Sequence, residues 1–272
     1  MDDVALKALA QRLAEIPGVV AVVLGGSRAR GTHRPDSDID LGLYVRGDLD
    51  VMALRALAVQ EAGEQASVTA PGGWGPWVNG GGWLTIDDWR VDWIYRDLDR
   101  VRRVWTDCQE GRYEVGVQAG HPLGFYSHAY AGEVALCRVL ADPGGELTAL
   151  RESTQMYPTA LSTALVDGLW EADFSVGLAR YGAVGTDPAY AAGCLFRAVG
   201  VACQALHGHA GQWLINEKGM VASAGRLPLA PQDFAARAQR LLGHVGESMQ
   251  QIEQTVADAA TLVRQVRTAV GH

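Results

Sequence analysis

Residues 25–45 read GGSRARGTHRPDSDIDLGLYV, a glycine-serine turn followed by a polar segment and an apolar run. A second apolar run, Val19–Leu24, precedes the turn, so strands are expected on both sides of it. Asp38 and Asp40 stand at the head of the second strand. Strand side chains alternate between faces, so carboxylates two residues apart point the same way. Two like charges held at that spacing call for a cation between them. The stretch predicts a phosphate-binding turn beside a divalent-metal site, as needed for handling a nucleoside triphosphate.

Before residue 97 the chain mixes helical and strand patterns, and after it the pattern is helical. We expect a helix over 4–16, strands over 19–24 and 39–45, a helix over 50–65, and a hairpin of strands 83–87 and 90–95. Helices are then predicted over 97–110, 127–140, 153–181, 187–207, 231–243 and 246–270. Strands followed by a run of helices predict an α+β fold. Its expected parts are an N-terminal mixed β-sheet domain, 1–120, and a C-terminal α-helical bundle domain, 121–272.

Asp92 stands out on the second strand of the expected hairpin. Val91, Trp93 and Tyr95 share one face of this strand, and Asp92 shares the other with Arg90 and Ile94. A carboxylate in an apolar strand costs free energy unless its charge is compensated. Two interpretations stay open: Asp92 binds a metal ion, or it forms an ion pair with Arg90 or Arg96.

The pattern Gly26-Ser27-x-Ala29-x-Gly31, followed by Asp38-Ile39-Asp40, resembles the motif of the polymerase-β-like nucleotidyltransferase superfamily. The resemblance covers about the first hundred residues. It implies that Ser27 holds nucleotide phosphate, beside a backbone that Gly26 leaves open, and that Asp38 and Asp40 ligate Mg²⁺. Asp92 is the position that matches the third carboxylate of that family. Two Mg²⁺ ions and ATP as co-substrate follow from the resemblance, and Arg28, inside the motif, is a candidate contact for the triphosphate.

The helical half resembles, in layout more than in residues, the C-terminal domains of nucleotidyltransferases that modify aminoglycoside and lincosamide antibiotics. Glu133 lies where some of those enzymes place a general base, but a glutamate in an early helical turn also favours the helix dipole. Lys218 is the best match for a lysine that reaches the triphosphate, with an ordinary helix-terminal lysine as the alternative. Both roles are predictions from the resemblance.

A glycine-rich segment, 71–83, carries Trp74, Trp77 and Trp83 and cannot form a helix. We interpret it as a mobile loop or an irregular edge. Its tryptophans would stack on a base, a sugar or an antibiotic, or would anchor the segment to the sheet, and both interpretations stay open.

The composition restricts the partners. A net charge of −8 argues against binding long nucleic acid and suits a cationic small molecule. No apolar run reaches the ~20 residues that span a membrane, and no signal peptide is evident, so a cytoplasmic enzyme is expected. The expected reaction is transfer of AMP from ATP to a hydroxyl of a small molecule, an aminoglycoside-like antibiotic first, with release of pyrophosphate. Alternatives are AMP transfer to a protein, as in toxin-antitoxin systems, a tRNA-modifying or polymerising role, and nucleotide binding without turnover. The base preference and a homodimer stay open.

Overall fold

The computed structural model describes all residues, 1–272, and divides them into two compact units. The first, here called the sheet unit, comprises residues 1–107, 114–120 and 124–156. The second, the helical unit, comprises residues 108–113, 121–123 and 157–272. A mixed sheet in the N-terminal part and many helices in the C-terminal part confirm the predicted α+β fold class.

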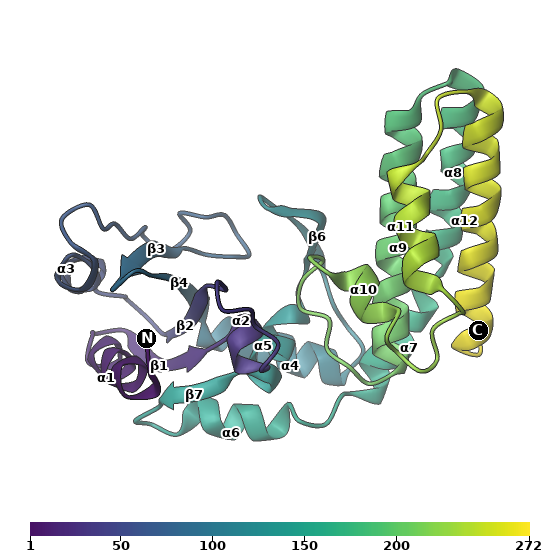
Figure 1. The fold of residues 1–272 in the computed structure, drawn as a ribbon. Helices are drawn as coiled ribbons and strands as arrows, with labels where there is room; N and C mark the ends of the chain where they lie inside the picture. Colours follow the sequence, from purple (N-terminus) through teal and green to yellow (C-terminus); the bar gives the residue numbers. More distant parts are fainter. The chain divides into compact units, whose positions relative to one another are not determined.

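The sheet unit is built on five strands in the spatial order β3-β4-β2-β1-β7 (Figure 1). Their bounds are β1 Val19–Leu24, β2 Ile39–Val45, β3 Gly81–Ile86, β4 Trp89–Asp97 and β7 Arg138–Ala141. β2 runs antiparallel to β1 and parallel to β4, whereas β3–β4 and β1–β7 are antiparallel pairs. Because β2 and β4 are parallel, both strands begin at the same edge of the sheet.

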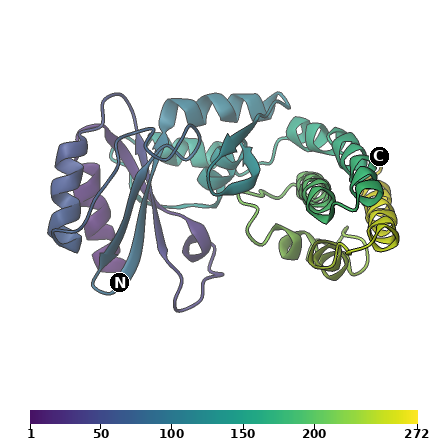
Figure 2. The same ribbon diagram turned by 90° about the horizontal axis from the view of Figure 1, so that it is seen from above.

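One face of this sheet forms the core with two helices, α1 (Asp3–Ala14) and α3 (Val51–Ala62), which lie on the same side of it (Figure 2). Leu41 and Leu43 of β2 and Trp93 of β4 are fully buried there. The predicted alternation along β4 is confirmed, since Val91, Trp93 and Tyr95 all belong to this core. Asp40 and Asp92 therefore lie on the opposite face.

The sheet unit has three further helices, α4 (Leu98–Gln109), α5 (Ala129–Leu136) and α6 (Glu146–Ser153). The last residues of α4 belong to the helical unit. Arg46, just after β2, pairs with Glu146 at the start of α6 at 2.8 Å, and Arg102 of α4 pairs with the same carboxylate at 2.7 Å. Hydrogen bonds from Arg46, above all, lower the pKa of Glu146 to about 2. This cluster ties β2, α4 and α6 together.

The structure divides the chain later than the expected boundary at residue 120. The segment predicted as one helix, 127–140, is the short helix α5 followed by strand β7, which pairs with β1 through Val139 and Val23. The chain thus returns to the sheet after α5, and the sheet unit extends to residue 156. A pairing between segments more than a hundred residues apart leaves no local periodicity from which it could be predicted.

A two-stranded sheet, β5 (Val115–Gln118) and β6 (His121–Tyr126), was not expected. Gln118, at the end of β5, holds the glycine-rich segment 71–83 in place. Its side chain accepts from the backbone amides of Trp77 and Val78 at 3.0 and 3.1 Å and donates to the carbonyl of Trp74 at 2.6 Å. Trp77 also stacks on Phe125, at 5.6 Å between ring centroids. The segment is therefore a tethered loop, which favours the anchoring interpretation for Trp77.

The helical unit is organised around α9 (Pro188–His209), which packs against α7, α8, α10, α11 and α12. Their bounds are α7 Thr159–Asp167, α8 Trp170–Gly185, α10 Met220–Ala224, α11 Phe234–Gly243 and α12 Met249–Ala269. The single helix expected over 153–181 is instead the end of α6, then α7 and α8, with a break at Gly168. By length and composition α9 is apolar enough to cross a membrane, but 61% of its apolar window is buried, as in a core helix.

Candidate active site

The glycine-serine turn is held directly against Asp40. The backbone amide of Gly25 donates to the carbonyl of Asp40 at 2.8 Å, which extends the β1–β2 pairing by one bond. Gly26 adopts a positive φ of +60°, and a Cβ added there would lie 1.8 Å from Oδ2 of Asp40. Only glycine leaves room for that carboxylate. Ser27 follows in a helical turn of four residues, α2 (Gly26–Ala29), so the serine and Asp40 are brought to one edge of the sheet.

Asp40 and Asp92 are register partners in the parallel β2–β4 pair. Side chains of directly opposite residues project from the same face of a sheet, so both carboxylates share the face opposite the core. Both side chains also make contacts within the protein. The structure thus brings together the Gly26-Ser27 turn, Asp40 and the carboxylate from the distant strand.

Asp38 lies just before β2 and is paired with a cation of the protein itself. Its Oδ1 is 2.5 Å from Nε of Arg90, in an ion pair without hydrogen-bond geometry. Arg96, the other arginine considered as a partner of Asp92, directs four N–H donors to Glu133, Val78 and its neighbour Tyr95. Arg90 and Arg96 thus form their ion pairs with Asp38 and Glu133.

Arg28 braces the loop that carries Asp38. Its Nε donates to the carbonyls of Ser37 and Asp38, both at 3.1 Å, and its guanidinium lies 5.0 Å from the ring centre of Trp89. The structure places Arg28 within the motif as a positioning residue, and its contact with a triphosphate stays a prediction.

The donor set of this edge fits Mg²⁺. Nowhere in residues 1–272 do three or more His, Cys, Asp or Glu side chains form a group that could hold a metal ion. Mg²⁺ does not require one, because it keeps several waters and is usually bound through one or two carboxylates and the substrate phosphates. Asp40 and Asp92 on one face supply carboxylates of this kind, and the space that Gly26 leaves over Asp40 lets a ligand approach.

Trp83 borders the same face. It is the register partner of Asp92 in the antiparallel β3–β4 pair, and its side chain is 72% exposed. Its ring stacks on Trp74 at 4.3 Å between centroids, with 16° between the planes. The exposed ring of Trp83, stacked on the half-buried ring of Trp74, forms an aromatic surface beside Asp92. From the sequence alone Trp83 was one of three equivalent tryptophans, and the strand register distinguishes it.

Glu133 lies on α5 and forms a two-pronged ion pair with the buried guanidinium of Arg96, at 2.6 and 2.8 Å. Burial by itself would lower the pKa of Arg96, but the charge and hydrogen bonds of Glu133 raise it well above its ordinary value. Arg96 follows Asp92 by four residues along β4, about 13 Å. The structure therefore gives Glu133 an anchoring contact between α5 and the sheet, and its role as a general base stays a prediction.

Lys218 belongs to the helical unit, in the loop before α10, where its backbone amide donates to the side chain of Asn216 at 2.6 Å. Oε2 of its neighbour Glu217 accepts from Nδ1 of His121 at 3.0 Å. This half-buried pair was not predicted, because the two residues are 96 positions apart. The contact between Lys218 and the triphosphate stays a prediction.

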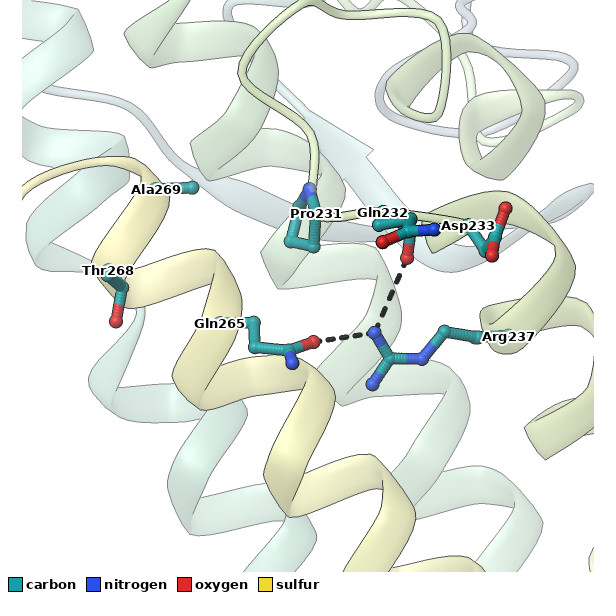
Figure 3. Close-up of a pocket in the computed structure, with 7 residues that line it drawn as sticks. All are labelled: Pro231, Gln232, Asp233, Arg237, Gln265, Thr268 and Ala269. Carbon is teal, nitrogen blue, oxygen red and sulfur yellow. Dashed lines mark hydrogen bonds between the residues drawn. The ribbon is translucent and has the colours of Figure 1, made fainter.

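The helical unit carries an open groove of about 610 Å³ between α11 and α12 (Figure 3). Arg237 reaches across it, donating to Gln265 at 2.5 Å and to the carbonyl of Gln232 at 3.4 Å. None of the predicted site residues lines this groove. It is an open surface groove of the helical unit.

A comparison with known protein families finds a match within the sheet unit. Residues 6–69 match the family described as nucleotidyltransferase domain. This stretch of the chain is therefore similar to a nucleotidyltransferase domain. The matched stretch includes Ser27, Asp38 and Asp40 and ends before Asp92, so the motif lies inside the match and the third carboxylate outside it.

No curated protein sequence matches the chain. Among the solved structures that match is a nucleotidyltransferase-like protein from Exiguobacterium sibiricum 255-15. It is 12% identical, with a TM-score of 0.48, and the alignment covers 99% of this chain and 77% of that one.

Proposed function

We propose that this protein is a Mg²⁺-dependent adenylyltransferase that transfers AMP from ATP to a hydroxyl of a small molecule and releases pyrophosphate. One observation supports the proposal above all. Asp40 and Asp92 are neighbours on adjacent parallel strands and project from the same face of the sheet, and the Gly26-Ser27 turn packs against Asp40. The match of residues 6–69 to a nucleotidyltransferase domain supports the reaction class. AMP, magnesium and the acceptor are the proposed part, together with a cytoplasmic location.

In the reaction, the acceptor oxygen forms a bond to the α-phosphorus of ATP while the bond to the pyrophosphate oxygen breaks, and the acceptor proton is lost to solvent. Asp38, Asp40 and Asp92 would hold the metal, which when bound neutralises triphosphate charge and lowers the pKa of the acceptor hydroxyl. The Gly26-Ser27 turn would hold the triphosphate, and Arg28 keeps the loop before Asp38 in position. Asp38 would exchange Arg90 for the metal.

An aminoglycoside-like antibiotic is the acceptor we propose to test first. The net charge of −8 favours a polycationic ligand. The exposed Trp74–Trp83 stack beside Asp92 offers a flat surface on which the C–H face of a sugar ring can pack.

The test incubates the full-length protein with ATP, Mg²⁺ and a panel of aminoglycosides and lincosamides, and measures pyrophosphate together with the mass of the antibiotic. We expect pyrophosphate release and a product heavier by one nucleoside monophosphate, both lost with EDTA. Parallel reactions with GTP and CTP establish the base preference. Transfer that fails across the whole panel would contradict the antibiotic proposal, and a nucleotide found by mass spectrometry on a protein would favour protein modification instead.

A further inference from the structure

Helix α8 turns its large apolar side chains to the solvent and its small ones to the protein. Its buried side packs against α9 and α12 and consists of Ala172, Ser175, Val176, Ala179, Gly182 and Ala183. Its outer side exposes Trp170 by 63%, Phe174 by 58%, Tyr181 by 69% and Val184 by 75%. A helix that is stabilised only by its own bundle places its large apolar residues inward. The outer face of α8 is therefore suited to a second packing partner.

The exposed residues follow the spacing of a helix–helix interface. Positions 170, 174, 177, 181 and 184 are separated by four, three, four and three residues, which is the repeat of the a and d positions in coiled coils. The central position is Gly177, and a Cβ added there would meet no atom within 4 Å. We call these five residues the α8 seam.

We propose that the α8 seam joins two copies of this chain in an antiparallel homodimer, with the twofold axis at Gly177. The seam is nearly symmetric about that glycine. Antiparallel pairing places Trp170 opposite the partner's Val184 and Phe174 opposite the partner's Tyr181. The glycines meet at the axis, where the missing side chains let the two helices approach closely. Such an interface is self-complementary, as a closed twofold dimer requires.

The charges beside the seam favour the same arrangement. Asp173 and Arg180 are both exposed and lie four residues before and three residues after Gly177. In the antiparallel pair Asp173 faces the partner's Arg180, and the symmetry repeats the contact. Parallel pairing would not bring these opposite charges together, because Asp173 and Arg180 lie seven residues apart on the same flank of the helix. Asp173 is already held in place by Nε of Arg267 at 2.5 Å.

The area of the seam indicates a dimer of modest affinity. Aromatic side chains bury about 150–250 Å² each when fully covered, so the exposed parts of the seam offer on the order of 500 Å² per chain. With its polar flanks the interface approaches the ~800 Å² per partner of standard complexes. We therefore expect a dissociation constant in the micromolar range.

Sedimentation velocity of the full chain over about 1 to 100 μM tests the dimer, with wild type expected to pass from monomer to dimer. Phe174→Glu and Tyr181→Glu should each raise the dissociation constant about a hundredfold, since they place unpaired charge in the interface centre. Met52→Glu, at an exposed methionine of α3, is the matched control and should leave association unchanged. A chain that stays monomeric throughout, or dimers that survive both seam variants, would overturn the proposal.

Disulfide trapping tests the position of the axis. Gly177→Cys should cross-link the dimer under oxidising conditions, because the two copies of residue 177 meet. Val184→Cys should not, because seven residues on each side of the axis separate its copies by about 21 Å, beyond the ~7 Å limit of a disulfide. Wild type controls for the four native cysteines. Cross-linking at residue 184 in preference to 177 would rule out the antiparallel arrangement. Neither experiment depends on the proposed adenylyl transfer.

Discussion

Asp40 and Asp92 stand opposite one another in the parallel pairing of β2 with β4, so two carboxylates separated by 51 intervening residues project from the same face of the sheet. The turn that precedes them in the chain is packed against the first of the two. This arrangement carries the proposed chemistry and leads to the predictions that follow.

Replacing either carboxylate by its amide should abolish nucleotidyl transfer. Asp40→Asn and Asp92→Asn remove a negative charge that the metal and triphosphate need, and we expect kcat to fall by about 10³-fold or more, with little change in Tm. Pyrophosphate release at saturating ATP and Mg²⁺ is the measurement. Asp88→Asn, in the turn before β4, is the control, because asparagine tolerates its positive φ of 63°. Full activity in either site variant would contradict the metal assignment.

Gly26→Ala should cost both stability and activity, whereas Gly31→Ala should cost mainly stability. Both glycines have positive φ, +60° and +67°, so alanine is strained at each by about 1–2 kcal/mol. Only at Gly26 does the new methyl group collide with Asp40, since nothing lies within 4 Å at Gly31. Thermal unfolding and transfer assays on the pair separate the two effects. Equal activity of the two variants would show that the approach of Gly26 to Asp40 is not needed.

Glu133→Gln distinguishes an anchor from a general base. Removing the carboxylate leaves the buried guanidinium of Arg96 without its counter-charge, which should destabilise the protein by about 3 kcal/mol. Residual activity at low temperature, with an unchanged pH profile, is then expected. Glu152→Gln, at an exposed glutamate of α6, is the control for stability. If transfer were lost while Tm stayed constant, Glu133 would act in the reaction itself.

Acid should destabilise the helical unit through His207. Its ring is bonded to the carbonyl of Cys203 at 2.8 Å and to the hydroxyl of Ser223 at 2.9 Å, and burial lowers its pKa below the ordinary 6.5. His207 therefore binds a proton more readily in the unfolded chain than in the folded chain. The free energy of unfolding should fall as pH drops below about 6.5, by at most ~1.4 kcal/mol per pH unit.

Denaturant unfolding between about pH 7.5 and 5 measures this slope. His207→Gln should flatten it, and His33→Gln, at an exposed histidine, should not. An unchanged slope in the His207 variant would assign the acid sensitivity to other groups.

Trp83→Ala should weaken acceptor binding and leave folding intact. The ring is largely exposed and contacts Trp74, so its loss removes little buried area, but it removes the aromatic surface beside Asp92. We expect KM for the acceptor to rise about tenfold, with KM for ATP unchanged. Val117→Ala, at an exposed valine of β5, is the control. A rise in KM for ATP instead would indicate that the tryptophans contact the nucleotide.

Much of the sheet unit could be predicted from the sequence because its signals are local. The runs before and after the Gly26-Ser27 turn, and the alternation along β4, each follow from spacing within a few residues. The same holds for α4, α9, α11 and α12, whose bounds agree with the predictions to within three residues. The hairpin β5–β6 and strand β7 were missed, since strands of four to six residues in a helical context carry too little pattern to be distinguished.

By itself, the sequence indicated the proposed reaction class and the candidate carboxylates, because the spacing of glycines, serine and aspartates lies within one turn and its two strands. Only the tertiary structure decided what each distant side chain faces. It set Asp92 opposite Asp40, Trp83 beside Asp92, and Glu133 on the buried Arg96. It also showed that α8 packs through its small residues and leaves its aromatic ones exposed. Register and burial arise from pairing and packing between segments far apart in the chain, and local periodicity contains no information about which segments meet.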